Sequence, residues 1–266
     1  MSVDSLNVKP GMEVASLSDV GCQRENNEDS FLYWEPASDT EFQRKGRLAV
    51  IADGMGGYEG GQEASRLAVE TVRDVYDNSF RDDPQGTLLE AFAVAHQKIR
   101  GYAGQHPELH GMGTTCTALV VRGRQLYFAH VGDSRLYLVR GSRISRLTRD
   151  HSYVGRLVES GILRAEDAEK HPQRHILTAA LGAGSEMGVA VESAEPGIVL
   201  QDADALLLCT DGLWGVVTDD EIELAVRSGG PAECCAALVK LALQRGGPDN
   251  ITIQILRVLP GASVQP

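Results

Sequence analysis

Long apolar runs are missing from this chain of 266 residues. No run approaches the roughly 18 apolar residues that a membrane-spanning helix requires, so the sequence predicts no such span. The N-terminus also lacks a basic segment followed by an apolar one, which is the pattern of a secretory signal. We therefore expect a cytoplasmic protein.

Cysteine spacing typical of metal or redox sites is absent as well. The five cysteines are odd in number and form no C-x-x-C motif. Most lie in apolar surroundings, so we expect reduced core thiols, in keeping with a cytoplasmic location. They are Cys22, Cys116, Cys209, Cys234 and Cys235.

An excess of positive charge is also missing. Lys and Arg number 25 against 37 Asp and Glu, which gives a formal net charge of −12. Such a surface repels nucleic acids and anionic membranes at long range, so neither is expected as a partner. Hydrophobic residues make up 42% of the chain, which is enough for the core of one large globular domain.

The apolar periodicity predicts an α+β fold. Helices are expected after Gly61 and over 86–103, 219–228 and 231–245. Strands are expected near 13–19, 29–34, 47–52, 114–121, 125–131, 135–140, 143–147, 188–194, 205–210 and from Ile251 onward. The four strands between 114 and 147 are typical of an antiparallel meander. Helices in consecutive pairs favour two packed antiparallel sheets with helix pairs outside, rather than a doubly wound parallel sheet.

Residues 148–187 differ in character from the rest of the chain. Polar and charged residues dominate this segment, and its helices are expected to be short. We interpret it as an irregular subdomain that lies over the sheet. No internal repeat or low-complexity linker divides the chain, so a single domain is expected.

Acidic residues occur at five places where an apolar run gives way to a turn. Two places share one pattern, because residues 48–52 lead into Asp53-Gly54 and residues 206–210 lead into Asp211-Gly212. An aspartate at the end of a buried strand, followed by a glycine that permits close backbone approach, suits a hard cation. Oxygen ligands without nearby His or Cys favour Mg²⁺ or Mn²⁺ over zinc. The five places are Glu28-Asp29, Asp53-Gly54, Asp133, Asp211-Gly212 and Asp249-Asn250.

Each of these places has a simpler structural interpretation. Asp53-Gly54 could form a hairpin turn, although three glycines in residues 53–57 and a following helix favour a ligand site. Asp133 and Asp249 could lie in plain turns. Their joint occurrence instead suggests one cleft, in which one or two divalent cations would relieve the repulsion between carboxylates.

Arg24 lies three to five residues before Asn27-Glu28-Asp29, a charged cluster that alone could be a solvated loop. Its planar guanidinium can grip two phosphate oxygens at once. Among the histidines, His96 and His130 are expected to be structural, whereas His151 and His175 are candidates for substrate contact. Cys209 is expected to be a core thiol rather than a nucleophile.

Other catalytic templates are missing. The chain has no G-x-S-x-G, no H-E-x-x-H, no Gly-Lys-[Ser/Thr] phosphate loop and no G-x-G-x-x-G after a strand. Six motifs, in order, instead resemble the bacterial branch of the protein phosphatase 2C family of metal-dependent Ser/Thr protein phosphatases. They are Arg24-x-x-Asn27-Glu28-Asp29, residues 53–57, Gly111-Met112-Gly113-Thr114-Thr115, Val131-Gly132-Asp133-Ser134-Arg135, Asp211-Gly212-Leu213-Trp214 and Asp249-Asn250.

The resemblance covers about residues 13–258 and implies a four-layer α-β-β-α sandwich with a metal centre in a cleft at one end. It implies one phosphatase domain over 1–266, in which 148–187 corresponds to the family's variable flap. By position, Asp53 would bridge two Mn²⁺ or Mg²⁺ ions, and Gly54 would add its carbonyl to one of them. Asp211 and Asp249 would hold the other ion, partly through water.

Further roles follow from the same resemblance. Asp29 would bind a metal or its water ligands, with Glu28 and Asn250 as support around it. Asp133, together with Asp211, corresponds to a third and weaker metal site in the family.

The implied reaction is direct hydrolysis of phosphoserine and phosphothreonine, without a phosphoenzyme. A water bridging the two metals would attack phosphorus, while Arg24 and the metals absorb charge on the phosphoryl oxygens. The implied partners are phosphorylated proteins, with the enzyme acting as a monomer that counteracts a Ser/Thr kinase.

Two positions depart from the animal members of the family. Met55 replaces a histidine proposed there as general acid, so the leaving alkoxide must take its proton from water. Gly215 replaces an aspartate of the third metal site. Two rival hypotheses are a binding protein that keeps the fold without the chemistry and a phosphodiesterase or nuclease. The first is disfavoured because the core ligand positions are filled, and the second because of the net charge.

Overall fold

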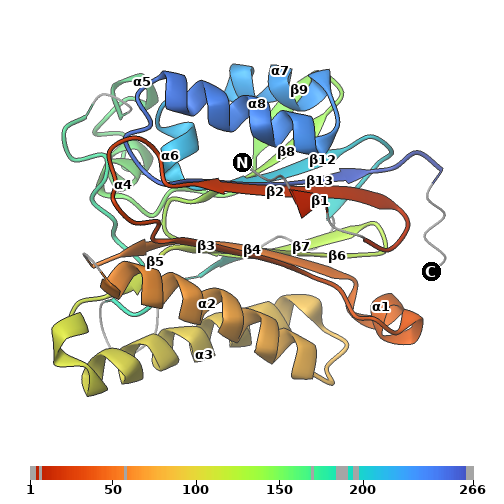
Figure 1. Cartoon of the computed structure of the whole chain (residues 1–266), viewed down its shortest axis with the longest axis horizontal. Coiled ribbons are helices and arrows are strands. Elements are labelled where there is room, and N and C mark those ends of the chain that lie inside the picture. Colours follow the sequence, from red (N-terminus) through yellow and green to blue (C-terminus); the bar gives the residue numbers. More distant parts are fainter. Residues whose placement is uncertain are drawn as a thin grey trace.

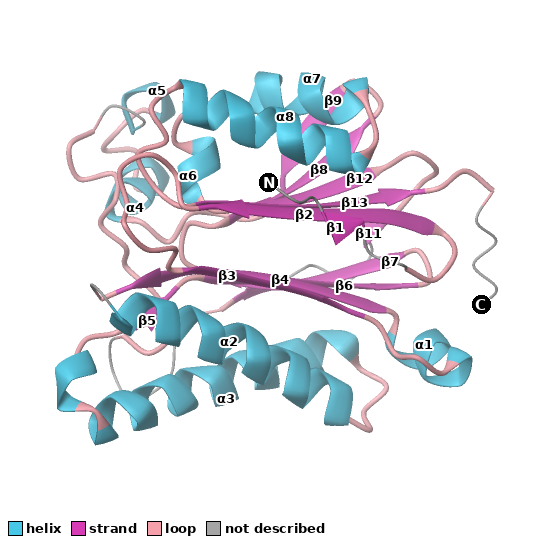
Figure 2. Cartoon of the chain, viewed as in Figure 1, coloured by secondary structure: helices cyan, strands magenta, loops and turns pink. Residues whose placement is uncertain are grey.

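The computed structural model describes residues 4–5, 8–56, 59–168, 171–183, 191–193 and 198–261. Two antiparallel sheets pack face to face, and a pair of helices covers the outer face of each (Figures 1 and 2). Helices α2 (Glu59–Asn78) and α3 (Pro84–Gln105) cover one sheet, and α7 (Asp219–Ser228) and α8 (Pro231–Gln244) cover the other. The predicted α+β sandwich of four layers is confirmed.

The first sheet joins the two ends of the chain. Its β2 (Met12–Asp19) pairs along its whole length with β13 (Ile251–Val258). This pairing places residues near the start of the chain beside residues near its end. The strand order is β1 (Asp4–Ser5), β2, β13, β12 (Ala205–Cys209), β8 (Arg135–Arg140) and β9 (Arg143–Arg146).

The second sheet is built around β4 (Arg47–Met55), which pairs with β3 on one side and β6 on the other. Its strand order is β10 (Glu192–Ser193), β7 (Gln125–Val131), β6 (Cys116–Arg122), β4 and β3 (Asp29–Trp34). Two short strands are added: β11 (Ile198–Val199) pairs with β7, and β5 (Gly113–Thr114) pairs with β4.

Strand β4 is apolar on both faces because both are buried. Leu48 and Val50 pack with α2 and α3, whereas Ala49 and Ile51 face the space between the sheets. All four are fully buried, and burying a side chain the size of Leu or Ile contributes about 1.5–3 kcal/mol. A strand covered on both faces reads as a continuous apolar run, which is the pattern of residues 48–52.

Local capping sets several helix boundaries. Asp83 accepts a hydrogen bond from the backbone N–H of Gly86 at 3.0 Å, and Pro84 fills the first position of α3. Thr218 and Glu221 form a capping box at the start of α7. The predicted helices 219–228 and 231–245 therefore agree with α7 and α8 within one residue.

The structure corrects the prediction of a single meander. Strands β6 and β7 pair in the second sheet, whereas β8 and β9 pair in the first. The chain crosses from one sheet to the other at residues 132–134. Periodicity identified each strand but could not identify its partner, because both sheets bury one apolar face against the same inner layer.

Several elements differ from the predicted boundaries. The predicted strand 47–52 continues through Asp53 and Gly54 to Met55. The prediction missed α1 (Asp39–Lys45) and α6 (Asp211–Trp214). Of the strand predicted near 188–194, β10 is described, while 188–190 and 194 lie outside the described residues.

The predicted flap, residues 148–187, contains the short helices α4 (Tyr153–Glu159) and α5 (Ala165–Ala168). Isolated bridges join Ser152 to Leu177 and Thr114 to Leu181. Residues 169–170 and 184–187 of this segment lie outside the described residues, as does Gly57 of the glycine-rich motif. Within the described ranges, no helix combines the length and apolar character needed to cross a bilayer.

Candidate active site

A cavity of about 530 Å³ lies at one end of the sandwich, near β5 and α6 (left in Figure 1). Four predicted metal-site aspartates line it, and they come from both sheets. Asp53 lies in β4, Asp133 in the turn before β8, Asp211 at the start of α6 and Asp249 just before β13. Residues separated by almost 200 positions in the sequence thus share one pocket.

Asp29 lies beside Asp53, because β3 and β4 pair these two residues directly. One carboxylate oxygen of Asp29 accepts hydrogen bonds from the hydroxyls of Thr210 at 2.8 Å and Thr252 at 2.7 Å. Thr252 lies in β13 and Thr210 directly follows β12, and both strands belong to the first sheet. These hydrogen bonds therefore link Asp29, in the second sheet, to the first sheet. Its other oxygen, Oδ1, is buried and has no hydrogen-bond partner among the described residues.

Asn250 fixes the loop that carries the first acidic pair. Its side-chain oxygen accepts a hydrogen bond from the backbone N–H of Glu28 at 2.8 Å. Its amide nitrogen donates to the carbonyls of Val20 and Asn26, both at 2.9 Å. The side chain is buried, so these bonds tie the loop before β3 to the start of β13.

Gly54 lies where β4, the start of α2 and residue 28 come together. A Cβ atom added at Gly54 would lie 2.1 Å from the carbonyl oxygen of Gly61 and 2.7 Å from that of Glu28. A Cβ added at Gly61 would lie 2.1 Å from a carboxylate oxygen of Glu28. These positions require glycine because the backbones approach too closely for any side chain.

Each carboxylate in this cluster makes ionisation of its neighbours less favourable. Burial, reinforced by Asp211 and Asp249, raises the pKa of Asp29 to about 7, against the lowering effect of its two threonine partners. Burial and then the charge of Asp29 raise the pKa of Asp53 well above its usual range. Burial and then Asp211 do the same for the pKa of Asp133. A bound cation would remove this penalty.

The donor set fits Mg²⁺ or Mn²⁺. All candidate ligand atoms are oxygens, and Oδ1 atoms of Asp29 and Asp211 are buried without hydrogen-bond partners in the described part of the chain. Within the same residues, no three His, Cys, Asp or Glu side chains form a ready-made cluster around one metal. Cations here would therefore take part of their coordination from water and a backbone carbonyl, as Mg²⁺ commonly does.

Arg24 lies at the rim of the cavity. Its Nη2 donates a hydrogen bond to Oδ2 of Asp249 at 2.7 Å, and this bond raises the pKa of the guanidinium. The Arg24 side chain is 51% exposed, so part of the guanidinium faces solvent. That position suits the predicted contact with an entering phosphate.

The two histidines considered for substrate contact lie in different places. His175 lines the cavity, with Nδ1 at 3.8 Å from Oδ2 of Asp211. His151 is not among the residues that line the cavity; its ring accepts a hydrogen bond from the backbone N–H of Gly132 at 3.2 Å and so supports the turn before Asp133. Of the two, His175 is therefore the one placed for substrate contact.

The remaining side chains singled out by the sequence are structural. His130 is fully buried between Thr117 and the carbonyl of Arg149, and burial lowers the pKa of His130 to about 3. His96 is also buried and accepts a hydrogen bond from the backbone N–H of Gly182. Cys209 is fully buried in the first sheet, and burial raises the pKa of its thiol.

Sequence reasoning missed several residues that position the acids. Besides Thr210 and Thr252, the hydroxyl of Thr115 accepts a hydrogen bond from the backbone N–H of Asp53 at 2.9 Å. The indole N–H of Trp214 donates to the carbonyl of Asp133 at 2.9 Å. Thr115 and Trp214 lie within recognised motifs, which was an available signal, whereas Thr252 lies inside an ordinary strand pattern.

Comparisons with known proteins agree with this arrangement. A family model described as protein phosphatase 2C matches residues 23–228. The serine/threonine protein phosphatase PstP of Mycobacterium tuberculosis is 36% identical over 255 residues, which cover 93% of this chain and 45% of PstP. This chain thus spans less than half the length of PstP.

Two further matches extend over nearly the whole length of the matched chain. The protein phosphatase PhpP of Streptococcus pneumoniae is 36% identical over 251 residues, which cover 92% of this chain and 97% of PhpP. A crystal structure of the catalytic domain of PstP in complex with two manganese ions superposes with a TM-score of 0.78 and 33% identity. The match covers 94% of this chain and 99% of that domain.

Proposed function

The chain belongs to the protein phosphatase 2C family, and from this premise we propose that it hydrolyses phosphoserine and phosphothreonine in proteins in a metal-dependent reaction. The observation that carries the proposal is the shared cavity lined by Asp53, Asp133, Asp211 and Asp249. Cations held by these acids would supply the concentrated positive charge that a phosphoryl group needs.

We assign the metal-holding roles as follows. Asp53 would hold both cations, Gly54 would contribute its carbonyl to one, and Asp211 and Asp249 would hold the other. When bound, two Mn²⁺ or Mg²⁺ ions supply a water that loses its proton near neutral pH, and positive charge opposite the phosphoryl oxygens. Burial and the raised pKa of Asp53 support its central role, because a cation would be needed to keep that carboxylate ionised.

The supporting residues keep the acids in place. The two threonine hydroxyls hold one oxygen of Asp29 and leave the other directed away from them. The side-chain oxygen of Asn250 accepts a hydrogen bond from the backbone N–H of Glu28, and this bond fixes the loop. Asp133, with Asp211, would form a third and weaker site, which Gly215 cannot complete because it has no side chain.

Arg24 binds and orients the phosphoryl group in this proposal. Its guanidinium is held at the rim by Asp249, which leaves other N–H groups for two phosphoryl oxygens. Water attacks phosphorus opposite the leaving alkoxide, and no side chain becomes phosphorylated. Met55 lines the cavity but its thioether cannot donate a proton, so water must protonate the leaving alkoxide.

The remaining proposals concern context. We propose a single phosphatase domain over 1–266 in which the flap, 148–187, contributes Arg174, His175 and Leu177 to the rim of the cavity. We further propose a monomer that works in the cytoplasm and opposes a Ser/Thr kinase, without nucleic acid or membrane as partner. All five cysteines, which lie in described ranges, are free thiols, and this supports a reducing compartment.

A phosphopeptide assay tests the proposal. With Mn²⁺, the chain should release phosphate from a phosphothreonine peptide, and excess EDTA should stop the release. Asp53→Ala and Asp249→Ala should each abolish it, whereas Asp220→Ala, an exposed acid of α7, should not. Turnover that survives EDTA or Asp53→Ala would contradict the metal-dependent reaction. Preferential cleavage of a phosphodiester over a phosphomonoester would point to a nuclease instead.

A further inference from the structure

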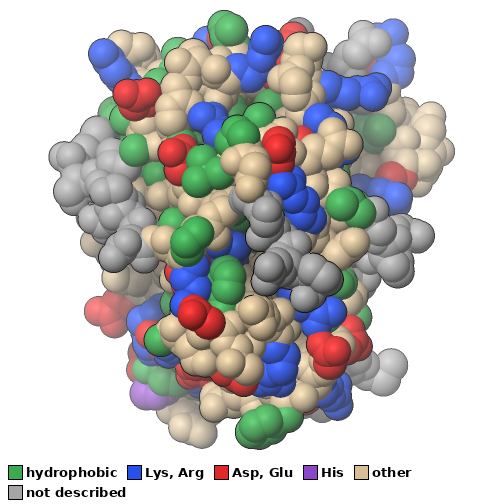
Figure 3. All heavy atoms as spheres, turned by 90° about the vertical axis from the view of Figure 1, so that its right-hand side faces the viewer, with side chains coloured by type: hydrophobic (Ala, Val, Ile, Leu, Met, Phe, Trp, Pro, Cys, Tyr) green, Lys and Arg blue, Asp and Glu red, His purple; other side chains and the backbone are tan. Residues whose placement is uncertain are grey.

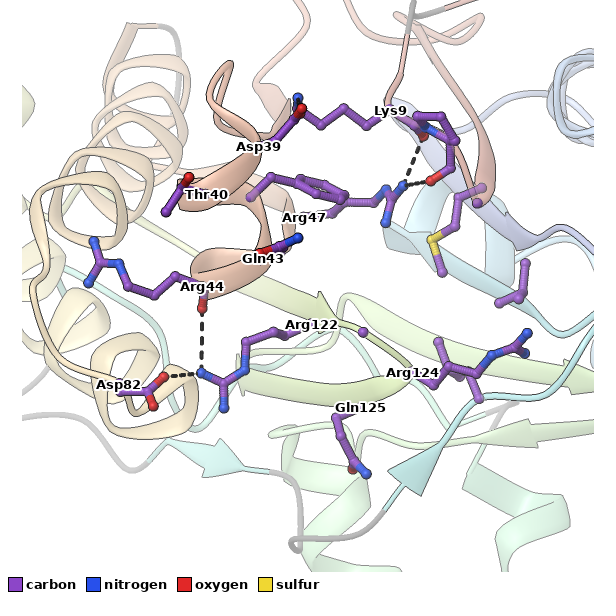
Figure 4. Close-up of a pocket in the computed structure, with 18 of the residues that line it drawn as sticks. Lys9, Asp39, Thr40, Gln43, Arg44, Arg47, Asp82, Arg122, Arg124 and Gln125 are labelled. Carbon is purple, nitrogen blue, oxygen red and sulfur yellow. Dashed lines mark hydrogen bonds and ion pairs between the residues drawn. The ribbon is translucent and has the colours of Figure 1, made fainter. Parts of the chain in front are cut away.

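A second cavity lies at the opposite end of the sandwich and plays no part in the proposed reaction. Its volume is about 1380 Å³, and it lies between α1, the start of β4 and the β6–β7 turn (Figure 4). Strand β4 connects the two cavities, because Arg47 begins it here and Asp53 lies six residues further on, about 20 Å away.

Five basic side chains line this cavity, although the chain as a whole has a net charge of −12. Figure 3 looks onto this end of the molecule and shows several Lys and Arg side chains across it. The cavity lining contains only two carboxylates, Asp39 and Asp82. We call this site the arginine pocket; its basic residues are Lys9, Arg44, Arg47, Arg122 and Arg124.

Each of these five side chains has a carboxylate partner, and in four of the five pairs the acid lies on the solvent side. Four of the cations (Lys9, Arg44, Arg122 and Arg124) are 20–28% exposed, whereas their partner acids Asp39, Glu41, Asp82 and Asp202 are 42–91% exposed.

The order is the reverse in two pairs on other helices. The acid is the more buried partner in the pairs Arg66–Glu63 and Arg227–Glu223. Such exposed pairs contribute only about 0–1 kcal/mol, so an entering anion can replace the acids at small cost.

Arg47 adds a fixed positive charge inside the pocket. Its side chain is 7% exposed, and its Nη2 donates to the carbonyls of Lys9 at 2.9 Å and Pro10 at 2.6 Å. Its Nε makes no hydrogen bond to the described residues, and a carboxylate oxygen of Glu35 lies 3.5 Å away. Carbonyls are neutral acceptors, so one carboxylate beyond hydrogen-bonding geometry is the main compensation for this buried charge.

The pocket also offers an apolar surface to the body of a ligand. Met12, Leu200 and Val258 reach it from the core between the sheets, and the ring of Phe42 lies 4.6 Å from the guanidinium carbon of Arg47. The volume exceeds what an inorganic anion requires. Arginine forks match the geometry of phosphate oxygens, and an aromatic ring beside them suits a planar group.

From these observations we propose that the arginine pocket binds a phosphorylated small molecule of nucleotide size, with the phosphate beside the β6–β7 turn, where Arg122 and Arg124 lie, and the apolar body against Phe42 and Met12. This binding does not depend on the phosphatase reaction, because the pocket contains none of the residues assigned to the metal centre.

Calorimetric titration with ADP, in EDTA to keep the catalytic site free of cations, tests the proposal. The unaltered chain should bind with a dissociation constant below about 1 mM, and Arg122→Glu and Arg124→Glu should each weaken binding at least about tenfold. Arg24→Ala, at the catalytic rim, and Arg227→Glu, a matched charge reversal on α7, should bind as the unaltered chain does. Adenosine, which lacks phosphate, should not bind.

Thermal unfolding of each variant identifies any variant that fails to fold, and the Mn²⁺-dependent phosphatase activity of the Arg122, Arg124 and Arg227 variants is a second check. Arg122→Lys serves as the milder replacement and should bind only a fewfold more weakly. The proposal is overturned if the unaltered chain does not bind ADP at millimolar concentration, if adenosine binds equally well, or if Arg24→Ala abolishes binding while Arg122→Glu does not.

Discussion

The same local sequence, an apolar run followed by aspartate and glycine, produces two different structures in this chain. At Asp53-Gly54 the strand β4 continues, and Gly54 pairs with Thr114 of β5. At Asp211-Gly212 the strand β12 has already ended, and the two residues begin helix α6. Hydrogen-bonding partners far away in the sequence, rather than local propensity, decide which of the two forms.

What the two sites share is a close crossing of backbones at the glycine. An added Cβ at Gly54 would lie 2.1 Å from the carbonyl oxygen of Gly61, and one at Gly212 would lie 2.0 Å from that of Asn250. Each crossing brings the preceding aspartate to the cavity shared by both sheets. The glycine therefore has the same role at both sites, although the secondary structure around it differs. It allows a second segment of the chain to lie beside the acid.

The two aspartates differ in their surroundings, and exchanging each for asparagine should reveal the difference. Both Asp53→Asn and Asp211→Asn should lower Mn²⁺-dependent phosphatase activity more than about 100-fold, because each removes a charged ligand. In EDTA, Asp53→Asn should also raise the melting temperature, since it removes a carboxylate that the charges of Asp29 and Asp211 repel. Asp211→Asn should raise it less, because Nδ1 of His175 lies 3.8 Å from the Asp211 carboxylate.

Activity assays and thermal unfolding of the two variants measure both effects. Asp220→Asn is the control, because this exposed acid lies outside the cavity and should alter neither quantity. Full activity in Asp53→Asn, or a lower melting temperature in EDTA, would show that repulsion does not dominate at this position.

The two glycines should respond alike, despite their different secondary structures. Gly54→Ala and Gly212→Ala should each lower the free energy of unfolding by about 3 kcal/mol, because the new methyl group must displace a backbone carbonyl. Urea unfolding measures this loss. Gly101→Ala, inside α3 with nothing within 4 Å of the added Cβ, should instead stabilise by about 0.5–1 kcal/mol. If only one of the two glycines resists replacement, the shared crossing does not explain both.

The sequence predicted most elements, because periodicity and capping are local. Helix α7 begins where it was expected because Thr218 and Glu221 cap its start, and it ends before Gly229. The continuation of β4 through Asp53-Gly54 was not predictable in this way, since Asp-Gly favours a turn unless another strand pairs with it. The division of the expected meander between two sheets escaped prediction for a similar reason.

The acids of the site were predictable, but their support was not. Asp53, Asp133, Asp211 and Asp249 were selected by their position after apolar runs, and they line one cavity. Thr252 holds Asp29 from a strand 223 residues away, and nothing in its own neighbourhood marks it. His151 and His175 could not be told apart in the sequence, because proximity to the flap gave no information on which side of the turn the ring of His151 would lie.

The repulsion between these acids should finally appear as a dependence of stability on pH. The pKa of Asp29 is raised to about 7 in the folded chain from an ordinary value of 3.8, and the pKa of Asp53 is raised as well. A carboxyl group that is easier to protonate when folded stabilises the fold fully below its unfolded pKa, and this contribution is lost as the pH rises through the folded pKa. Metal-free protein should therefore lose stability between about pH 4 and 7, by up to about 1.4 kcal/mol per pH unit for each such group.

Thermal unfolding in EDTA across this pH range measures the slope. Saturating Mn²⁺ should raise the melting temperature and flatten the dependence, because a cation stabilises the ionised carboxylates. Asp53→Asn should flatten it in part even without metal, since one of the titrating groups is gone, whereas Gly101→Ala should leave the slope unchanged. If the stability of the metal-free protein instead rises with pH over this range, the acids near Asp53-Gly54 stay ionised at little cost. Repulsion from other acids would then no longer distinguish Asp53 from Asp211.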